Sequence, residues 1–243
     1  METRAAAPHE VVVRMVRTRI LDDVERWARA RAMLSAEELG TLGRLRPRAA
    51  RRDYLAGHAL ARTMIADVIH ADPARIRFRP APGGRPELIA PRRASRVSFS
   101  LSHADGIALC AVSAHHAVGA DVESLRCVGD DPLGVAATIC STSERALLAA
   151  SPPATLARRL LSIWTVKEAI AKATGLGVRL PLDRITVHTP SGVCTGAVDA
   201  AFEDEPSTWR LASMQPTPRH AAAIAVRSAP DAPVVFRFER SMA

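Results

Sequence analysis

Hydrophobic residues in the first half of the chain change from strand-like to helical spacing and back again. The short apolar run 11–16 predicts a strand, and a helix is expected over 21–34. Between 51 and 69 the apolar positions recur three or four residues apart, which predicts the most regular helix of this half. Alternating or short apolar runs then predict three strands, at 97–102, 107–113 and 117–122.

The second half follows the same order of elements. Helical patterns are predicted from about 132 to 150 and from about 154 to 174, with Pro152-Pro153 between them. Short strands are expected afterwards, at 184–189, 196–198, 209–214 and 221–226. Because each half has helices followed by strands, the order predicts an α+β protein of two similar halves, 1–115 and 116–243. No direct sequence repeat joins the halves.

The composition is that of an ordinary soluble globular protein. Hydrophobic residues make up 48% of the 243 residues and charged ones 24%, a balance that supports a proper core. No apolar run approaches the roughly 20 residues that cross a bilayer, and the first residues lack a signal-peptide pattern. The four cysteines have neither CxxC spacing nor a histidine at zinc-ligand spacing, which favours reduced thiols. We therefore expect a soluble, cytoplasmic protein.

The charge balance favours an anionic partner. The net charge is +8, which suits a nucleic acid, a phosphorylated small molecule or an acidic protein surface. Basic residues recur through 44–52, 75–96 and 158–159, a distribution that fits a basic groove better than a tail. Only two of the 33 basic residues are lysines, Lys167 and Lys172. A lysine ammonium is a compact charge that suits phosphate, so their clustering indicates a specific role.

Three carboxylates accompany these lysines. Asp121 and Glu123 lie two positions apart in a predicted strand, so their side chains point to the same side. Such a pair is either solvated surface charge or a site for a hard cation such as Mg²⁺. Glu168 shares a helix face with Lys172, which is either an exposed ion pair or a third carboxylate of the same site. Three carboxylates, one Mg²⁺ and lysines form the outline of a phosphoryl-transfer site.

Taken in order, four segments resemble one known family. They are Gly84-Arg-Pro86, Phe99-Ser-Leu-Ser-His103, Val118-Gly-Ala-Asp-Val-Glu123 and Trp164-Thr-Val-Lys-Glu-Ala-Ile-Ala-Lys172. Together they resemble the 4′-phosphopantetheinyl transferase superfamily, specifically its longer, Sfp-like group. The resemblance implies a pseudo-dimeric α+β monomer that binds coenzyme A in a cleft between its halves. The first half would hold the nucleotide end, and the second half the Mg²⁺ and the catalytic carboxylates.

The family pattern also implies roles for the charged residues of the second half. Asp121, Glu123 and Glu168 look like the Mg²⁺ ligands, and Asp121 and Lys172 look like contacts to coenzyme A. Glu168, directly or through a metal-bound water, is the candidate base for an acceptor hydroxyl. Asp121 and Lys172 belong to the same catalytic set. Lys167 either assists them or makes a structural ion pair.

The first half would supply the contacts to the nucleotide end of coenzyme A. Ser102 and His103 look like such contacts, with His103 facing the 3′-phosphate. Arg85 stands where family members often carry lysine. Arg52, and with it Arg44, would match the basic residues of the first helical region.

The resemblance implies transfer of 4′-phosphopantetheine from coenzyme A to a serine of an apo acyl or peptidyl carrier protein. The reaction would depend on Mg²⁺ and release adenosine 3′,5′-bisphosphate. Polyketide, nonribosomal-peptide, siderophore and fatty-acid carriers all remain open as partners. No nucleic acid or membrane partner is expected.

Two other functions also fit parts of the pattern. A Mg²⁺-dependent nuclease uses an acidic pair with a glutamate–lysine element, and the net charge would suit nucleic acid. Against it, the Ser102-His103 segment has no role there, and aromatics for base stacking are few. A protein that only binds coenzyme A or a carrier protein is the other alternative. Such a protein has no need to keep all the carboxylates and lysines.

Overall fold

The computed structural model of the chain describes residues 9–80, 86–91, 97–187, 198–199, 208–228 and 233–240. The chain forms two compact units. The first comprises Met1–His116 together with Val235–Ala243, and the second comprises Ala117–Val234. The C-terminal segment therefore belongs to the first unit, whereas the order of predicted elements groups it with the second half.

The first unit is built on a four-stranded sheet with the order β11-β1-β5-β4. Its strands are β1 (Glu10–Arg17), β4 (Ser98–Ala104), β5 (Ile107–Ser113) and β11 (Val235–Arg240). β4 and β5 form an antiparallel pair, and β5 is antiparallel to β1. β11 runs parallel to β1, with Val11 opposite Phe236.

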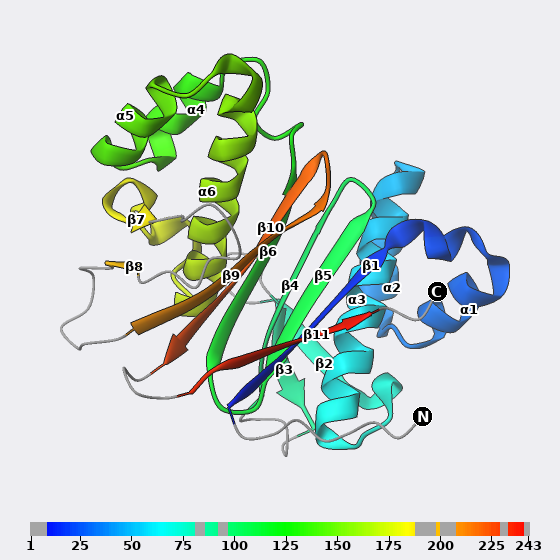
Figure 1. Cartoon of the computed structure of the whole chain (residues 1–243). Helices are drawn as coiled ribbons and strands as arrows, with labels where there is room; N and C mark the ends of the chain where they lie inside the picture. The colour runs from blue at the N-terminus through cyan, green and yellow to red at the C-terminus, as the bar shows by residue number, and fades with distance from the viewer. Residues whose placement is uncertain are drawn as a thin grey trace. The chain divides into compact units, whose positions relative to one another are not determined.

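Helices cover this sheet. They and the smaller elements of the first unit are η1 (Thr18–Asp22), α1 (Val24–Ala32), α2 (Ala36–Arg44), α3 (Arg48–Ile69), η2 (Pro73–Arg75), β2 (Arg77–Pro80) and β3 (Pro86–Ala90). The 22-residue helix α3 packs on β4 and β5 (Figure 1). Ile65 of α3 and Phe99 and Val112 of the sheet belong to one buried core cluster.

The second unit has a three-stranded antiparallel sheet with the order β6-β10-β9. Its elements are β6 (Ala117–Ser124), α4 (Pro132–Ile139), α5 (Thr142–Ala149), α6 (Pro153–Thr174), η4 (Gly177–Arg179), η5 (Leu182–Arg184), β7 (Thr186–Val187), β8 (Val198–Asp199), β9 (Thr208–Thr217) and β10 (His220–Ser228). The 22-residue helix α6 packs on β6 and β10, and α4 and α5 lie against α6 (Figure 1). Ile170 of α6, Leu211 of β9 and Ala223 of β10 share one buried cluster.

Local sequence signals set the ends of these helices. Ser35 and Glu38 form a reciprocal capping box at the start of α2, and Ser141 and Glu144 form another at the start of α5. Gly175 ends α6 with φ 74°, a left-handed conformation that glycine adopts without steric cost.

The α+β class and the order of the main elements are confirmed. The helical stretch predicted over about 132–150 is divided into two helices, because the capping box at Ser141 starts a new helix after α4. Helix α3 begins earlier than predicted, at Arg48, directly after Pro47. None of the helices among the described residues is long and apolar enough to cross a membrane.

Candidate active site

The site is built where α6 approaches β6 most closely, at Gly119. A Cβ atom added to Gly119 would lie 1.8 Å from the carbonyl oxygen of Ala169 and 2.7 Å from the amide nitrogen of Ala173. Only a residue without a side chain therefore permits this contact. Because residues 119, 121 and 123 of a strand point to the same side, the contact brings two carboxylates of β6 to α6.

Asp121 and Lys172 form an ion pair across this contact. The Lys172 Nζ donates to Asp121 Oδ1 at 2.7 Å and to the carbonyl oxygen of Ala120 at 3.2 Å. The Asp121 side chain is only 3% exposed, whereas that of Lys172 is 26% exposed. The strand carboxylate is thus buried beneath a lysine that still reaches solvent.

Glu123 and Glu168 lie in the electric field of the same site. Burial, and after it the charge of Asp121, raises the pKa of Glu123 to about 7, although Lys172 opposes the shift. Glu168 adds a smaller rise to the pKa of Glu123. The pKa of Glu168 is itself raised, first by burial and then by Asp121. Asp121 and Lys172 are therefore in direct contact, and Glu123 and Glu168 lie within electrostatic reach of them.

The chemistry of these donors fits a magnesium ion. All three are carboxylates, the hard oxygen ligands that Mg²⁺ prefers, and a divalent cation would relieve their mutual repulsion. As they stand, no three acidic, histidine or cysteine side chains among the described residues are gathered closely enough to hold a metal ion. Asp121 Oδ1 is instead paired with the Nζ of Lys172.

Lys167 lies away from the Asp121–Lys172 ion pair and has different partners. Its side chain is completely buried, and its Nζ donates to Glu144 Oε2 at 2.5 Å. The same nitrogen donates to the carbonyl oxygens of Ile139 at 2.7 Å and Leu182 at 2.8 Å. These contacts are those of a structural ion pair, the second of the two roles that the sequence left open.

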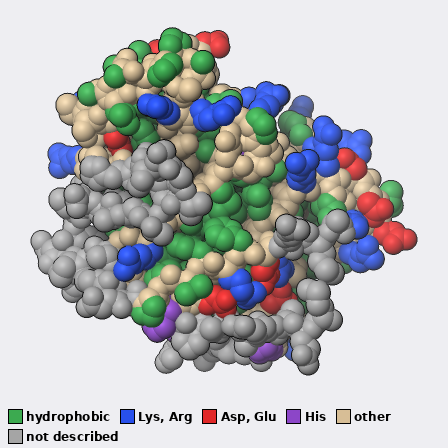
Figure 2. All heavy atoms as spheres, viewed as in Figure 1, with side chains coloured by type: hydrophobic (Ala, Val, Ile, Leu, Met, Phe, Trp, Pro, Cys, Tyr) green, Lys and Arg blue, Asp and Glu red, His purple; other side chains and the backbone are tan. Residues whose placement is uncertain are grey.

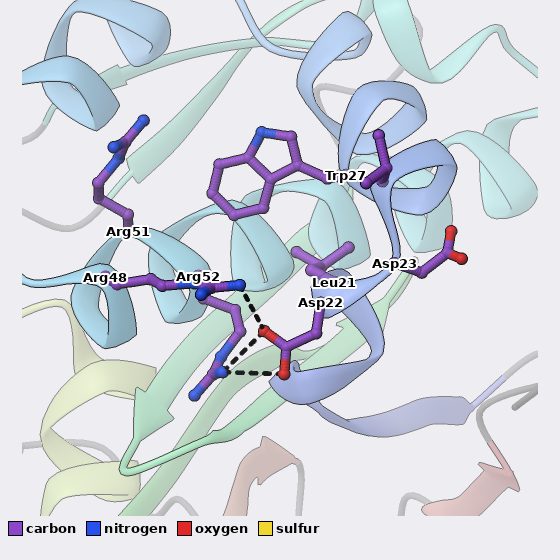
Figure 3. Close-up of a pocket in the computed structure, with 8 residues that line it drawn as sticks. Leu21, Asp22, Asp23, Trp27, Arg48, Arg51 and Arg52 are labelled. Carbon is purple, nitrogen blue, oxygen red and sulfur yellow. Dashed lines mark hydrogen bonds and ion pairs between the residues drawn. The ribbon is translucent and has the colours of Figure 1, made fainter.

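Arg52 of the first unit lines a pocket of about 310 Å³ between α3 and the segment that enters α1. Its guanidinium donates to Asp22 at 3.1 Å, and a guanidinium nitrogen of Arg48 lies 3.5 Å from Asp22 (Figure 3). The guanidinium carbon of Arg51 lies 5.8 Å from the ring centre of Trp27, a cation–π arrangement. The pocket thus combines three arginines with one aromatic face.

The other predicted residues of the first unit are placed separately. Arg44 is exposed at the end of α2 and donates to the hydroxyl of Thr41 at 2.9 Å. Ser102 is buried and His103 exposed, on opposite sides of β4. A Cβ on Gly57 of α3 would lie 3.5 Å from the His103 ring, so this ring faces α3. Arg85 falls outside the described residues.

Sequence reasoning missed three features of these sites. It gave no role to Gly119, although a glycine inside a strand pattern is a signal for close backbone approach. It did not connect Glu144 with Lys167, because the two lie far apart in sequence. It also missed Trp27 and its neighbouring arginines as a pocket lining.

Comparison with known proteins identifies the family of the chain. Residues 117–225 match the 4′-phosphopantetheinyl transferase superfamily, and residues 22–115 match the N-terminal region of 4′-phosphopantetheinyl transferases. The chain is 30% identical over 195 residues to the 4′-phosphopantetheinyl transferase HetI of Nostoc, covering 80% of this chain and 79% of that protein. The chain belongs to the 4′-phosphopantetheinyl transferase family. The sequence-based prediction of an enzyme of this class is confirmed.

Further relatives carry the same name. This transferase is 31% identical over 211 residues to a phosphopantetheinyl transferase of Thraustochytrium, covering 82% of this chain and 72% of that protein. A crystal structure of a holo-(acyl-carrier-protein) synthase from Bacillus anthracis, in complex with CoA (3′,5′-ADP), matches at a TM-score of 0.40 and 18% identity. That match covers 46% of this chain and 96% of the synthase, and it is too distant to place single residues.

Proposed function

We propose that this transferase moves 4′-phosphopantetheine from coenzyme A to a serine hydroxyl of an apo acyl or peptidyl carrier protein, in a Mg²⁺-dependent reaction. Adenosine 3′,5′-bisphosphate would be the leaving group. The observation that carries the proposal is the meeting of Asp121, Glu123, Glu168 and Lys172 at the Gly119 contact. The names of the relatives support the same reaction class.

The three carboxylates would hold the magnesium ion. When bound, Mg²⁺ supplies charge neutralisation for the pyrophosphate of coenzyme A. Asp121 and Glu123 present their oxygens from β6, and Glu168 presents its own from α6. Lys172, whose amine still reaches solvent, would donate hydrogen bonds to a phosphate oxygen.

Glu168 is the proposed base of the reaction. The serine oxygen forms a new bond to the β-phosphorus, the bond from that phosphorus to the bisphosphate breaks, and the serine proton passes to Glu168. A base works best when its pKa lies near the working pH. Burial and the charge of Asp121 shift the pKa of Glu168 upward, in the direction that this role requires.

The first unit would hold the nucleotide end of coenzyme A. Arg44, Arg52, Arg85, Ser102 and His103 are its proposed contacts. The pocket beside Arg52 adds a planar aromatic ring and permanent positive charge, both suited to a phosphorylated nucleotide.

We further infer a cytoplasmic monomer that serves polyketide or nonribosomal-peptide carriers in secondary metabolism. Carrier proteins are acidic as a class, and the net charge of +8 would attract them. Basic side chains occupy several separate places on the face in Figure 2, with acidic ones among them. On this face the attraction would therefore come from several separate places and not from one patch.

Intact-protein mass spectrometry tests the proposal. An apo carrier protein is incubated with the transferase, coenzyme A and Mg²⁺, with EDTA in a parallel sample. A mass gain of roughly 340 Da that EDTA abolishes is the expected result for one Mg²⁺-dependent transfer of phosphopantetheine. A gain that survives EDTA would refute the metal requirement. Coenzyme A binding without any gain across several carriers would indicate a binding protein instead.

A further inference from the structure

The two units share one internal plan, in more detail than the order of predicted elements shows. Each has a first strand (β1 or β6), a 22-residue helix (α3 or α6) and a later hairpin whose second strand pairs with the first strand. Both first strands contain eight residues. When α3 and α6 are aligned from their first residues, four positions are identical: Ala49/Ala154, Leu55/Leu160, Ile65/Ile170 and Ala66/Ala171. That is too few for a visible repeat.

A buried cation occupies the same position in both helices. Counting Arg48 and Pro153 as first, Arg62 is the fifteenth residue of α3 and Lys167 the fifteenth of α6. Neither side chain is exposed to solvent. Each forms an ion pair with the glutamate of a capping box on the preceding helix, Glu38 for Arg62 and Glu144 for Lys167.

The remaining hydrogen bonds of the two pairs are also alike. Arg62 donates to the carbonyl oxygens of Pro73 at 3.1 Å and Ile76 at 2.6 Å. Lys167 likewise donates to two backbone carbonyls, those of Ile139 and Leu182. Each cation therefore ties its long helix to a capping box and to two further points of the backbone.

Lys167 has no hydrogen left for a substrate. An ammonium group has three hydrogens and no acceptor, and its three partners here lie within 2.8 Å. Glu144 is equally engaged, since it accepts from the backbone amides of Ser141 at 2.7 Å and Val187 at 2.8 Å. The pair is a closed network in the interior of the second unit.

The two units differ at the positions that carry the chemistry. The twentieth helix residue pairs with the fifth residue of the first strand in both, but with opposite charges: Asp67 with Arg14 in one, Lys172 with Asp121 in the other. At the positions of Glu168 and Glu123, the first unit has Thr63 and Val16. The buried pair thus occurs in both units, whereas the acidic cluster occurs in one.

We propose that the Lys167–Glu144 pair is a positioning device, which sets the rotation of α6 so that Glu168 and Lys172 face β6. Lys167 directly precedes Glu168, and on the other side the backbone of α6 meets Gly119 without space between them. The turn that carries the catalytic side chains is therefore held from two directions. This inference rests on the proposed roles of Glu168 and Lys172, and it assigns Lys167 no contact with substrate.

The test compares matched double variants in the two units. Lys167→Met with Glu144→Gln removes the pair behind the active site, and Arg62→Met with Glu38→Gln removes its counterpart. Arg62 lies ten residues beyond Arg52, about 15 Å along α3. The substitution at Arg62 in the control variant is therefore distant from the arginine pocket. The transfer assay gives kcat, KM for coenzyme A and the Mg²⁺ concentration for half-maximal rate, and thermal unfolding gives Tm.

If the pair positions α6, the two double variants should differ in activity even where they lose similar stability. We expect the Lys167/Glu144 variant to lose about 10- to 100-fold in kcat and to need more Mg²⁺, with an unchanged shape of the pH–rate profile. The Arg62/Glu38 variant should keep its kcat and its Mg²⁺ requirement. Equal effects in both variants, or a wild-type kcat in the first, would overturn the proposal. Loss of one limb of the pH–rate profile would make Lys167 an acid or base and also overturn it.

The test also separates this inference from the proposed function. If the wild-type enzyme transfers without Mg²⁺, the metal assignment fails. The comparison of kcat between the two double variants would still measure whether the buried pair positions α6.

Discussion

At the scale of single residues, Gly119 decides whether the site can form. The helix that carries Glu168 and Lys172 reaches β6 only because position 119 has no side chain. Its counterpart in the first unit, the third residue of β1, is Val12, which shows that the fold itself tolerates a larger spacing there. The glycine therefore serves the close packing of α6 on β6, and through it the placement of the proposed site residues.

We expect Gly119→Ala to reduce both stability and activity. The added methyl group would overlap Ala169 and push α6 outward, at a cost of about 1–3 kcal/mol in the free energy of unfolding. Thermal unfolding and the transfer assay measure the two effects. Gly43→Ala in α2 is the control, since nothing lies within 4 Å of its Cβ position and helix propensity favours alanine by up to about 1 kcal/mol. Full activity in the Gly119 variant would refute the close-contact argument.

We expect Asp121→Asn to lose at least about 100-fold in transfer rate. Replacing even a residue that only hydrogen-bonds to a metal ligand reduces metal affinity or activity by about 10- to 100-fold. The amide keeps the size of the side chain, so the fold should be retained. Asp130→Asn, an exposed carboxylate of the same unit, should retain full activity. Initial rates at several Mg²⁺ concentrations distinguish the two. A small loss that high Mg²⁺ does not alter would place the metal elsewhere.

At the scale of elements, the capping box of α2 makes the first unit sensitive to acid. Burial would raise the pKa of Glu38, but hydrogen bonds from His58, the Ser35 amide and Arg62 outweigh it and lower this pKa to about 2. A carboxyl whose pKa is lower in the folded state stabilises the fold above its unfolded pKa. That contribution is lost as the pH falls from about 4.5 towards 2.

We expect Glu38→Gln to remove this part of the acid sensitivity. Its stability at pH 7 should fall by an amount on the order of 3 kcal/mol, whereas the difference from wild type should shrink towards pH 2. Denaturant titrations at about pH 7, 4 and 2.5 measure this difference in the free energy of unfolding. Glu37→Gln, one residue away and exposed, should follow the wild-type curve. A constant offset of the Glu38 variant at every pH would contradict the linkage.

The ion pairs at equivalent positions of the two units have their charges in opposite order. The double variant Asp121→Lys with Lys172→Asp reproduces in the second unit the charge order of Arg14 and Asp67. We expect it to be inactive but more stable than either single variant, with a coupling of about 0.5–3 kcal/mol. Urea unfolding of the three proteins and the wild type completes the cycle. Additive effects would mean that the two side chains do not interact.

Part of this structure could be predicted from local patterns and part could not. The apolar spacing predicts α3, α6 and the strands β5 and β6, because each is regular over many residues. The spacing of Asp121 and Glu123 likewise predicts that they share a face. The burial of Lys167 could not be predicted, because its partner Glu144 lies 23 residues away and belongs to another helix. Helical periodicity alone does not indicate which charged side chain of a helix is buried.

At the scale of the whole molecule, the net charge of +8 should act on the encounter with the carrier protein. We expect KM for an acidic carrier to rise between about 0.1 M and 1 M salt, where the screening length falls from about 10 Å to 3 Å. The rate at saturating carrier should change much less, because long-range attraction affects association. A steady-state series over salt measures both. A salt-independent KM would show that charge plays no part in the encounter.

The parallel pairing of β11 with β1 has a consequence for the order in which the protein is made. β1 joins residues from the beginning of the chain to a strand that the ribosome adds only after the whole second unit. Until then, one edge of β1 presents unpaired amides and carbonyls, the kind of edge that recruits other chains. The four-stranded sheet of the first unit is therefore completed only after the second unit has been translated. A fragment ending at residue 116 should need a tethered copy of the β11 segment to stay free of aggregation.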